Sequence, residues 1–256
     1  MSTLRKKRAR RRGAPALTVL LPAYNEAGSL PPVIAGIREA MKRAGGPGRA
    51  YEILVVDDDS PDGTAAAARK CGARVMVRKS KRGLSSAIWD GLWAARADCV
   101  IVMDADGQHD ANLIPIMAAD LRAGRADVAV GSRYVRGGSG FEDPVRRLIS
   151  AGAALMARPL TGELSDPMSG YFGVNRPRVG GGAGNGRPRA PGGPWHLRGF
   201  KFLPELLSRQ PGLRVREYPL VFGKRLGGRS KMNAGEVAAY ARLVLELYAD
   251  RLMRRR

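Results

Sequence analysis

The sequence predicts an α/β domain with a mostly parallel central sheet flanked by helices. Short apolar runs alternate with longer amphipathic stretches along most of the chain. One of these runs, residues 99–103, is apolar throughout, as expected of a central parallel strand covered on both faces. At 256 residues the chain is long enough for one large domain, or two small ones, with a sizeable core.

In the first half of the chain the expected strands and helices alternate. The apolar run at residues 17–21 predicts the first strand. A helix to about residue 41 follows, because Pro31 and Pro32 suit a first helical turn and apolar residues then recur three or four positions apart. The same pattern repeats downstream, with strands at residues 52–56, 74–78, 99–103 and 127–130 and helices at residues 65–70, 83–97 and 111–123.

The second half of the chain is less regular. Residues 144–160 have the pattern of a helix and residues 170–174 that of a strand. Residues 180–193 then hold seven glycines in fourteen positions, a composition that cannot pack a core. Regular patterning resumes at residues 200–207 and 215–221 and ends in an amphipathic helix at 236–252.

These patterns divide the chain into three parts. We expect a disordered basic arm at residues 1–16, the α/β domain at 17–235, and a C-terminal amphipathic helix with a basic end at 236–256. Within the domain, residues 176–198 form an atypical loop rich in Gly, Pro and Arg. This segment is either a real loop or the result of a reading-frame slip, because patterning fails and returns abruptly around it.

The chain is strongly basic and should meet a polyanion. It holds 44 Lys and Arg against 23 Asp and Glu, which gives a net charge of +21, and much of the excess lies in the two tails. Nucleic acid, phospholipid or a phosphorylated substrate would each fit this charge. Nucleic acid is the least favoured of the three, because aromatic residues make up only 6% and are not interleaved with cations.

The sequence predicts no transmembrane helix. No stretch approaches the roughly 18 to 20 apolar residues that span a bilayer, and residues 17–21 are too short for the core of a signal peptide. We therefore expect a cytoplasmic protein. Cys71 and Cys99 match no metal-binding or CxxC spacing, which favours reduced thiols.

The strongest candidate for chemistry is the pair Asp104 and Asp106, directly after the apolar strand. Residues two apart in an extended segment point to the same side, so both carboxylates can lie at the carboxyl edge of the sheet, where open α/β folds bind ligands. Such carboxylates suit Mg²⁺ or Mn²⁺ shared with a diphosphate. Gln108 can add a ligand or a bridging water, and His109 is a weaker candidate.

Acidic residues also follow the first two predicted strands. Glu26 and Asp58 should therefore reach the same edge of the sheet as the pair after the fourth strand. Carboxylates can accept the ring N–H donors of a base, while Pro22 and Tyr24 can line the flat walls of a nucleoside pocket. Each residue alone could equally be a cap or a turn residue, but together they predict a site for a nucleotide diphosphate.

In chain order, the motifs around these residues resemble those of the family 2 inverting glycosyltransferases with the GT-A fold. More narrowly, they resemble dolichol- or polyprenol-phosphate mannosyltransferases. The motifs are LPAYNE at residues 21–26, VVDDDSPDGT at 55–64, MDADGQ at 103–108 and GSRYVRGG at 131–138. The resemblance covers residues 17–175 and resumes at about 199–248, with a departure at the loop of 176–198.

The resemblance implies transfer of mannose from GDP-mannose to a polyprenyl monophosphate with inversion. The implied donor contacts are Pro22, Tyr24, Glu26, Val56, Asp58, Asp104, Ala105, Asp106, Arg133, Arg225 and Lys231. Among these, the implied catalytic residues are Asp104, Asp106, Arg133, Arg225 and Lys231, and the implied metal ligands are Asp104, Asp106 and Gln108. The acceptor phosphate would lie at Arg146 and Ser150, four residues apart on one helical face. Asp166 resembles a family residue near the sugar, but is equally well explained as an acid in a turn.

Several alternatives remain open at this stage. The donor can instead be a UDP-sugar such as UDP-glucose, because both donors need the same acidic metal site. The chain can also be an inactive relative, damaged at residues 176–198. A lipid acceptor would explain the basic tails, which favour a peripheral position on the anionic cytoplasmic face of a membrane. The closing helix then either lies in the membrane interface or packs on the core of its own domain.

Overall fold

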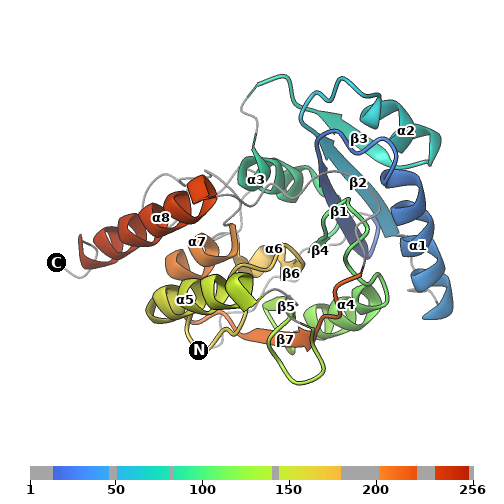
Figure 1. Cartoon of the computed structure of the whole chain (residues 1–256). Helices are drawn as coiled ribbons and strands as arrows, with labels where there is room; N and C mark the ends of the chain where they lie inside the picture. The colour runs from blue at the N-terminus through green and yellow to red at the C-terminus, as the bar shows by residue number, and fades with distance from the viewer. Residues whose placement is uncertain are drawn as a thin grey trace, which may run out of the picture.

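The computed structural model describes residues 14–45, 51–80, 83–139, 144–179, 202–223 and 234–253, and within these ranges it leaves out the side chains of 144–150 and 234–237. The strands are β1 (Leu17–Ala23), β2 (Tyr51–Asp57), β3 (Arg74–Val77), β4 (Cys99–Val102), β5 (Val128–Ser132), β6 (Phe172–Asn175) and β7 (Val215–Pro219). The helices are α1 (Leu30–Arg43), α2 (Thr64–Lys70), α3 (Leu84–Ala94), α4 (Leu113–Ala123), α5 (Pro144–Thr161), α6 (Arg176–Val179), α7 (Phe202–Arg209) and α8 (Ala234–Met253). Their order along the chain can be followed in Figure 1.

The strands form one mixed sheet in the order β3-β2-β1-β4-β6-β5-β7. All neighbouring pairs are parallel except those of β6, which runs antiparallel between β4 and β5. The expectation of a mostly parallel sheet flanked by helices is thus confirmed. Because β6 is reversed, its first residue lies at the same edge of the sheet as the carboxyl ends of the other strands.

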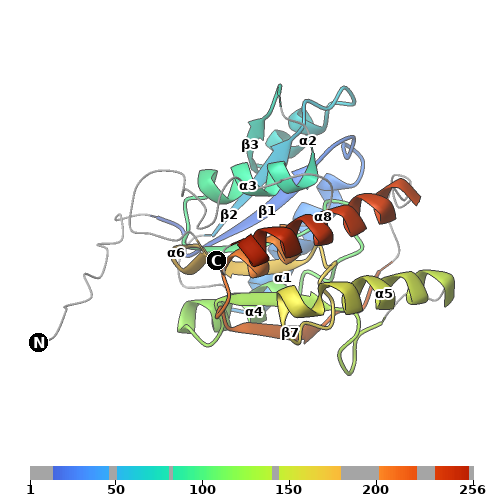
Figure 2. The same cartoon turned by 90° about the vertical axis from the view of Figure 1, so that its left-hand side faces the viewer.

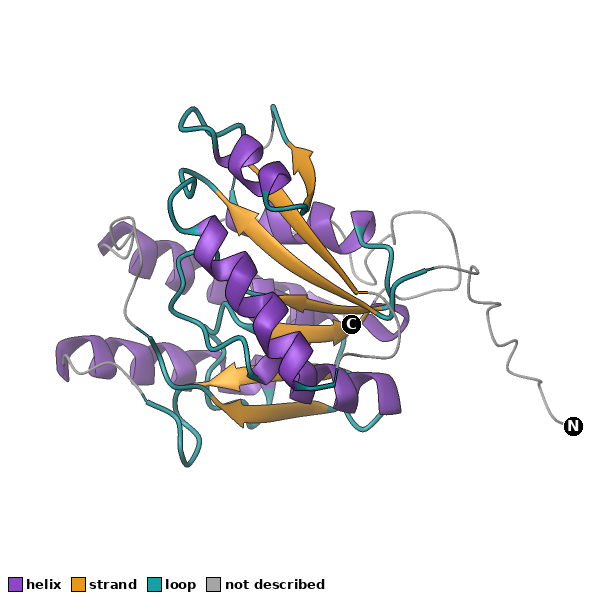
Figure 3. Ribbon diagram, turned by 90° about the vertical axis from the view of Figure 1, so that its right-hand side faces the viewer, coloured by secondary structure: helices purple, strands orange, loops and turns teal. Residues whose placement is uncertain are grey.

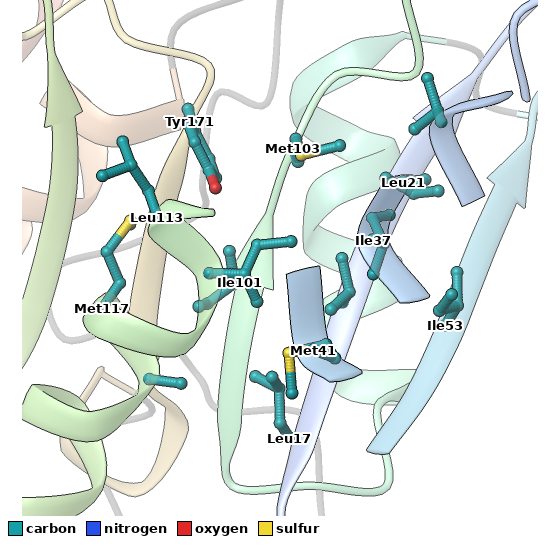
Figure 4. Close-up of a cluster of buried hydrophobic side chains, with 14 of the residues drawn as sticks. Leu17, Leu21, Ile37, Met41, Ile53, Ile101, Met103, Leu113, Met117 and Tyr171 are labelled. Atoms are coloured by element: carbon teal, nitrogen blue, oxygen red, sulfur yellow. The ribbon is translucent and has the colours of Figure 1, made fainter. Parts of the chain in front are cut away.

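Helices cover both faces of the sheet (Figure 3). On one face, α1 and α4 pack their apolar residues against the strands, and Figure 4 shows this core, with Ile37 and Met41 from α1 and Leu113 and Met117 from α4. On the other face, α3 and α7 bury a second core that includes Phe202. The buried strands explain why residues 99–102 carry no polar side chain: β4 is covered on both sides.

Helices α5 and α8 pack against each other, and Figure 2 shows them running side by side. Their contact buries Ala157 from α5 with Tyr240 and Leu247 from α8. One face of α8 therefore packs on the domain itself, as one of the two alternatives predicted. In the part of the chain that the structure describes, no helix is long and apolar enough to cross a membrane.

The predicted elements are present, with ends that differ by a few residues. The structure adds α6, a short helix at the start of the segment that the sequence predicts to be a loop. Arg176 and Arg178 in α6 pair with Asp98 and Asp127, and Val179 is buried. Residues 180–198 of the predicted loop, and residues 1–13 of the predicted arm, lie outside the described residues.

Candidate active site

The carboxyl edge of the sheet gathers most of the predicted site residues. In the register of β1 with β2, Ala23 lies opposite Asp57, and Leu20 on β1 lies opposite Val102 on β4. The segments that follow these three strands therefore begin side by side. At the same edge β5 ends beside β7, where Ser132 lies opposite Pro219. The topology thus brings the acids after β1, β2 and β4 to one place, as the sequence predicts.

The loop after β1 is held by side chains of the turn after β2. The backbone N–H groups of Asn25, Glu26 and Ala27 donate to Ser60 Oγ, Thr64 Oγ1 and Asp62 Oδ2 at 3.0, 2.9 and 3.0 Å. Three successive amides are therefore fixed by three side chains, which leaves this loop little freedom. The sequence identifies residues 60–64 only as a turn, although Ser, Asp and Thr in turns often accept backbone N–H groups in this way.

The residues predicted to face the nucleoside lie around this loop. Pro22 and Val56 are buried at the ends of β1 and β2, while the Tyr24 ring is 37% exposed. Glu26 is partly exposed, and its carboxylate accepts a hydrogen bond from Ser29 Oγ at 2.5 Å. The exposed Tyr24 ring and the hydrogen-bonded Glu26 carboxylate can therefore line one wall of a pocket for a base.

Asp58 is held by a residue that the sequence did not single out. Arg78, just after β3, donates from Nε to Asp58 Oδ1 at 2.7 Å and from Nη1 to Asp90 at 3.1 Å. The backbone N–H of Gly83 donates to the other oxygen of Asp58 at 2.8 Å. Arg78 and Asp58 are both buried, so the cation compensates a carboxylate that would otherwise be costly to bury. No sequence pattern marks Arg78, because its partner lies 20 residues away.

The loop after β4 presents the two predicted carboxylates at different depths. Asp106 is buried, whereas the Asp104 side chain is 36% exposed. Asp106 Oδ1 accepts the N–H of Gln108 at 3.0 Å, which closes a tight turn. Gln108 also pairs with Gly223 beyond β7: the backbone N–H of Gly223 donates to the backbone carbonyl of Gln108 at 2.8 Å. Ala105 is buried between the two acids.

His109 helps to hold the loop after β4 in place. Its Nδ1 accepts the backbone N–H of Asp104 at 3.2 Å, and its ring stacks on Tyr171 and meets Phe222 edge-on at centroid distances of 4.9 and 5.3 Å. Burial lowers the pKa of His109, although the carboxylates of Asp104 and Asp106 oppose the shift. A neutral ring with an unprotonated Nδ1 agrees with the observed hydrogen bond. We therefore describe His109 as a support of the acidic loop.

Arg133 lies directly after β5 and is paired with Asp166. Its Nε and Nη2 donate to the two carboxylate oxygens of Asp166, both at 2.7 Å, and its backbone N–H donates to the same group at 3.1 Å. The Asp166 side chain is fully buried, and Glu217 accepts the backbone N–H groups of Ser165 and Asp166. Asp166 is thus more than an acid in a turn: it fixes the guanidinium of Arg133.

Four predicted site residues cannot be placed. Arg225 and Lys231 lie outside the described residues. Arg146 and Ser150 belong to α5, but their side chains are outside the described part. Their roles stay predictions.

The chemistry of the acidic loop suits a hard divalent cation. Asp104, Asp106 and Gln108 offer carboxylate and amide oxygens on one short turn, the ligand type that Mg²⁺ and Mn²⁺ prefer. Among the described residues, no group of three or more His, Cys, Asp or Glu side chains is arranged to hold a metal. A site with two carboxylates fits a cation that also takes oxygens from a diphosphate and water.

Comparison with known proteins agrees with this arrangement. Residues 18–179 match the family described as Glycosyl transferase family 2. A dolichol-phosphate mannosyltransferase from Pyrococcus furiosus is 36% identical over 239 residues, covering 90% of this chain and 63% of the relative. A protein of the same name from Mycosarcoma maydis is 35% identical over 247 residues, covering 93% of this chain and 80% of the relative. This chain thus spans less than two thirds of the Pyrococcus protein.

A solved structure shares the fold. Glucosyl-3-phosphoglycerate synthase from Mycobacterium tuberculosis, in complex with Mn²⁺, UDP and glucosyl-3-phosphoglycerate, is 21% identical with a TM-score of 0.65. The match covers 94% of this chain and 81% of that one. The fold and the acids at its carboxyl edge define a glycosyltransferase of the GT-A class. The chain belongs to glycosyl transferase family 2.

Proposed function

We propose that this protein transfers mannose from GDP-mannose to a polyprenyl monophosphate with inversion at the anomeric carbon. The proposal rests on one observation: Glu26, Asp58 and the loop of Asp104 and Asp106 lie at the same edge of the sheet. The names of the relatives, dolichol-phosphate mannosyltransferases at 35–36% identity, support the sugar and the lipid class of the acceptor.

On this proposal the donor lies along the carboxyl edge. Pro22, Tyr24, Glu26, Val56 and Asp58 hold the nucleoside, at the end of the edge where β1 and β2 stop. The fixed loop after β1 supports this role, since a binding wall held by three hydrogen bonds loses little freedom when the donor binds.

The diphosphate then lies over the loop after β4. Asp104, Asp106 and Gln108 would hold Mg²⁺ or Mn²⁺ there, with Ala105 against the diphosphate, and such a cation when bound offsets the charge of the departing GDP. Asp166 holds Arg133 in place for contact with the phosphates. Arg225 and Lys231 are assigned to the same task on the strength of the sequence alone.

The acceptor supplies its own nucleophile. A phosphomonoester with a second pKa of about 6 is largely dianionic at neutral pH, so its oxygen needs no strong general base. That oxygen, held by Arg146 and Ser150, forms a bond to the anomeric carbon while the bond from this carbon to GDP breaks on the opposite face. Inversion follows from this in-line geometry.

A membrane-bound acceptor requires the enzyme to work at a bilayer. We assign the protein to the cytoplasmic face as a peripheral protein, attracted by its net charge of +21 to anionic lipid. Leu252 and Met253 near the end of α8 are 67% and 68% exposed beside the basic Arg251, a combination that favours the interface.

A transfer assay tests the proposal. The purified protein receives Mn²⁺ or Mg²⁺, a short polyprenyl phosphate in detergent, and either labelled GDP-mannose or labelled UDP-glucose, and organic-extractable label is counted. Label from GDP-mannose that disappears with a chelator is the expected result. Lipid-bound label from UDP-glucose would show that the protein uses a UDP-sugar as its donor instead. Donor binding without product would show that the protein is an inactive relative.

Variants connect the activity to the site. Asp104→Asn and Asp106→Asn should each lower kcat at least about a hundredfold, because each removes a negative charge that would hold the cation beside the diphosphate. Asp110→Asn is the matched control: Asp110 is exposed two residues after Gln108, and its carboxylate accepts the backbone and side-chain N–H groups of Asn112. Equal activity of all three variants would refute the assigned site.

A further inference from the structure

Gly170 lies directly across the sheet edge from Asp104. In the antiparallel pair of β4 and β6, Val102 is opposite Phe172. Continuing this register by two residues beyond each strand places Asp104 opposite Gly170. Side chains of directly opposed residues in such a pair point to the same side, with their Cβ atoms about 5 Å apart. A side chain at position 170 would therefore compete with the Asp104 carboxylate for the same space.

The distances show how tight this approach is. A Cβ atom added to Gly170 would lie 2.8 Å from Asp104 Oδ2, 3.2 Å from Oδ1 and 3.3 Å from Cγ. The φ angle of Gly170 is outside the left-handed region that L-residues rarely adopt. The backbone conformation therefore does not require glycine here. The space taken by the Asp104 carboxylate does.

His109 is a second neighbour of the Asp104 carboxylate. Its Nδ1 accepts the Asp104 N–H at 3.2 Å, and its Nε2 lies 3.9 Å from Asp104 Oδ2. The ring itself is fixed by stacking on Tyr171, the residue that follows Gly170. Tyr171 in turn is anchored in the core, where Figure 4 shows it near Leu113. The Asp104 carboxylate thus lies near both the His109 ring and the bare backbone of Gly170.

We propose that Gly170 is a positioning residue of the donor site, and that its lack of a side chain sets the direction of the Asp104 carboxylate. The inference rests on the proposed function, in which Asp104 holds a divalent cation and the sugar diphosphate. An added methyl group pushes the end of a partly exposed side chain, which can rotate away at little cost to folding. The same rotation moves a metal ligand out of position.

Two other glycines have different surroundings. A Cβ at Gly173 would lie 2.7 Å from Leu121 Cδ1 and 3.0 Å from Ile101 Cγ1, inside the core, so alanine there should destabilise the fold. Gly36 in α1 is exposed, and a Cβ at this position meets nothing within 4 Å. Gly36→Ala is therefore the matched control for Gly170→Ala: the same chemical change without a neighbour.

The experiment measures Mn²⁺ binding, so it does not depend on turnover. Free Mn²⁺ is followed by its electron paramagnetic resonance signal while protein and GDP are titrated, for the wild type, Gly170→Ala, Gly36→Ala, Asp104→Ala and the double variant Asp104→Ala/Gly170→Ala. We expect Gly170→Ala to weaken Mn²⁺ binding about tenfold or more, as loss of a supporting contact does in other metal sites. Gly36→Ala should bind as the wild type does. In the Asp104→Ala background the glycine substitution should have no further effect, because no carboxylate remains to be displaced.

The two proposals can fail separately. A wild-type protein that retains no Mn²⁺ with GDP overturns the proposed metal site and this inference with it. Wild-type binding together with an affinity of Gly170→Ala within twofold overturns the inference alone. So does an equal loss of affinity in the Asp104→Ala background, or a thermal midpoint of Gly170→Ala far below that of the wild type, since either would make Gly170 a packing residue.

Discussion

Replacing Arg78 with methionine tests how the nucleoside end of the site is built. The substitution keeps a long apolar side chain and removes the guanidinium that Asp58 and Asp90 share. We expect a less stable protein that has also lost donor affinity, because among the described residues Asp58 then keeps the hydrogen bond from the N–H of Gly83 at 2.8 Å but no cation. A buried carboxylate that loses its cation takes up a proton or draws in water, and either change alters the acceptor offered to a base.

The size of the effect follows from burial. The side chains of Arg78 and Asp58 are 5% and 9% exposed, and that of Asp90 is 21% exposed. Breaking a buried ion pair by removing one partner costs about 3–5 kcal/mol. The lower end of this range applies, since the Gly83 N–H remains and water can reach Asp90. We therefore expect a loss of about 3 kcal/mol, or roughly a hundredfold in the folding equilibrium.

Urea denaturation provides the assay. Arg78→Met should lower the denaturation midpoint at an unchanged slope. Arg96→Met is the control, because Arg96 is 66% exposed at 3.9 Å from Glu52 and should contribute less than about 1 kcal/mol. The double variant Asp58→Asn/Arg78→Met should recover part of the stability but none of the donor binding. Equal denaturation midpoints for Arg78→Met and Arg96→Met would refute the inference that the buried ion pair of Arg78 and Asp58 stabilises the protein.

Three further predictions concern other parts of the molecule. Hydrogen bonds from Arg214 help hold the pKa of Asp127 at about 2, below the usual 3.8. The stability that the Asp127 carboxylate contributes is therefore present above pH 4 and is lost as the pH falls toward 2. Because Arg214 is 55% exposed, we expect about 1 kcal/mol, measured as a flatter acid limb of the stability curve in Asp127→Asn. Asp62→Ala should raise the KM for the donor severalfold with a smaller change in kcat, because it frees the loop after β1 while the acidic loop after β4 stays intact; an unchanged KM in steady-state kinetics would contradict this. Leu252→Ser/Met253→Ser should lower sedimentation with anionic vesicles without changing activity in detergent, whereas loss in both assays would indicate a structural role.

Local patterns predict a large part of this fold. Residues 17–21 and 99–103 are apolar runs of strand length, and both lie in buried strands of the sheet. Asp104 and Asp106 can be predicted from the sequence because they follow such a run directly. The position of β6 could not be found in this way, because a strand pattern does not say which neighbours the strand pairs with or in which direction.

The reversed strand explains why Gly170 is not predicted from the sequence and why Asp166 is indicated there only by the family resemblance. In a sheet with only parallel strands, the carboxyl edge receives residues that follow strands, and a search for polar residues after apolar runs finds them. Because β6 is antiparallel, the residues that precede it, Asp166 and Gly170, come to the same edge. Asp166 holds Arg133 there, and Gly170 leaves room for Asp104. A glycine that acts by its missing side chain has no chemical signature, so only the register between β4 and β6 connects it to the acidic loop.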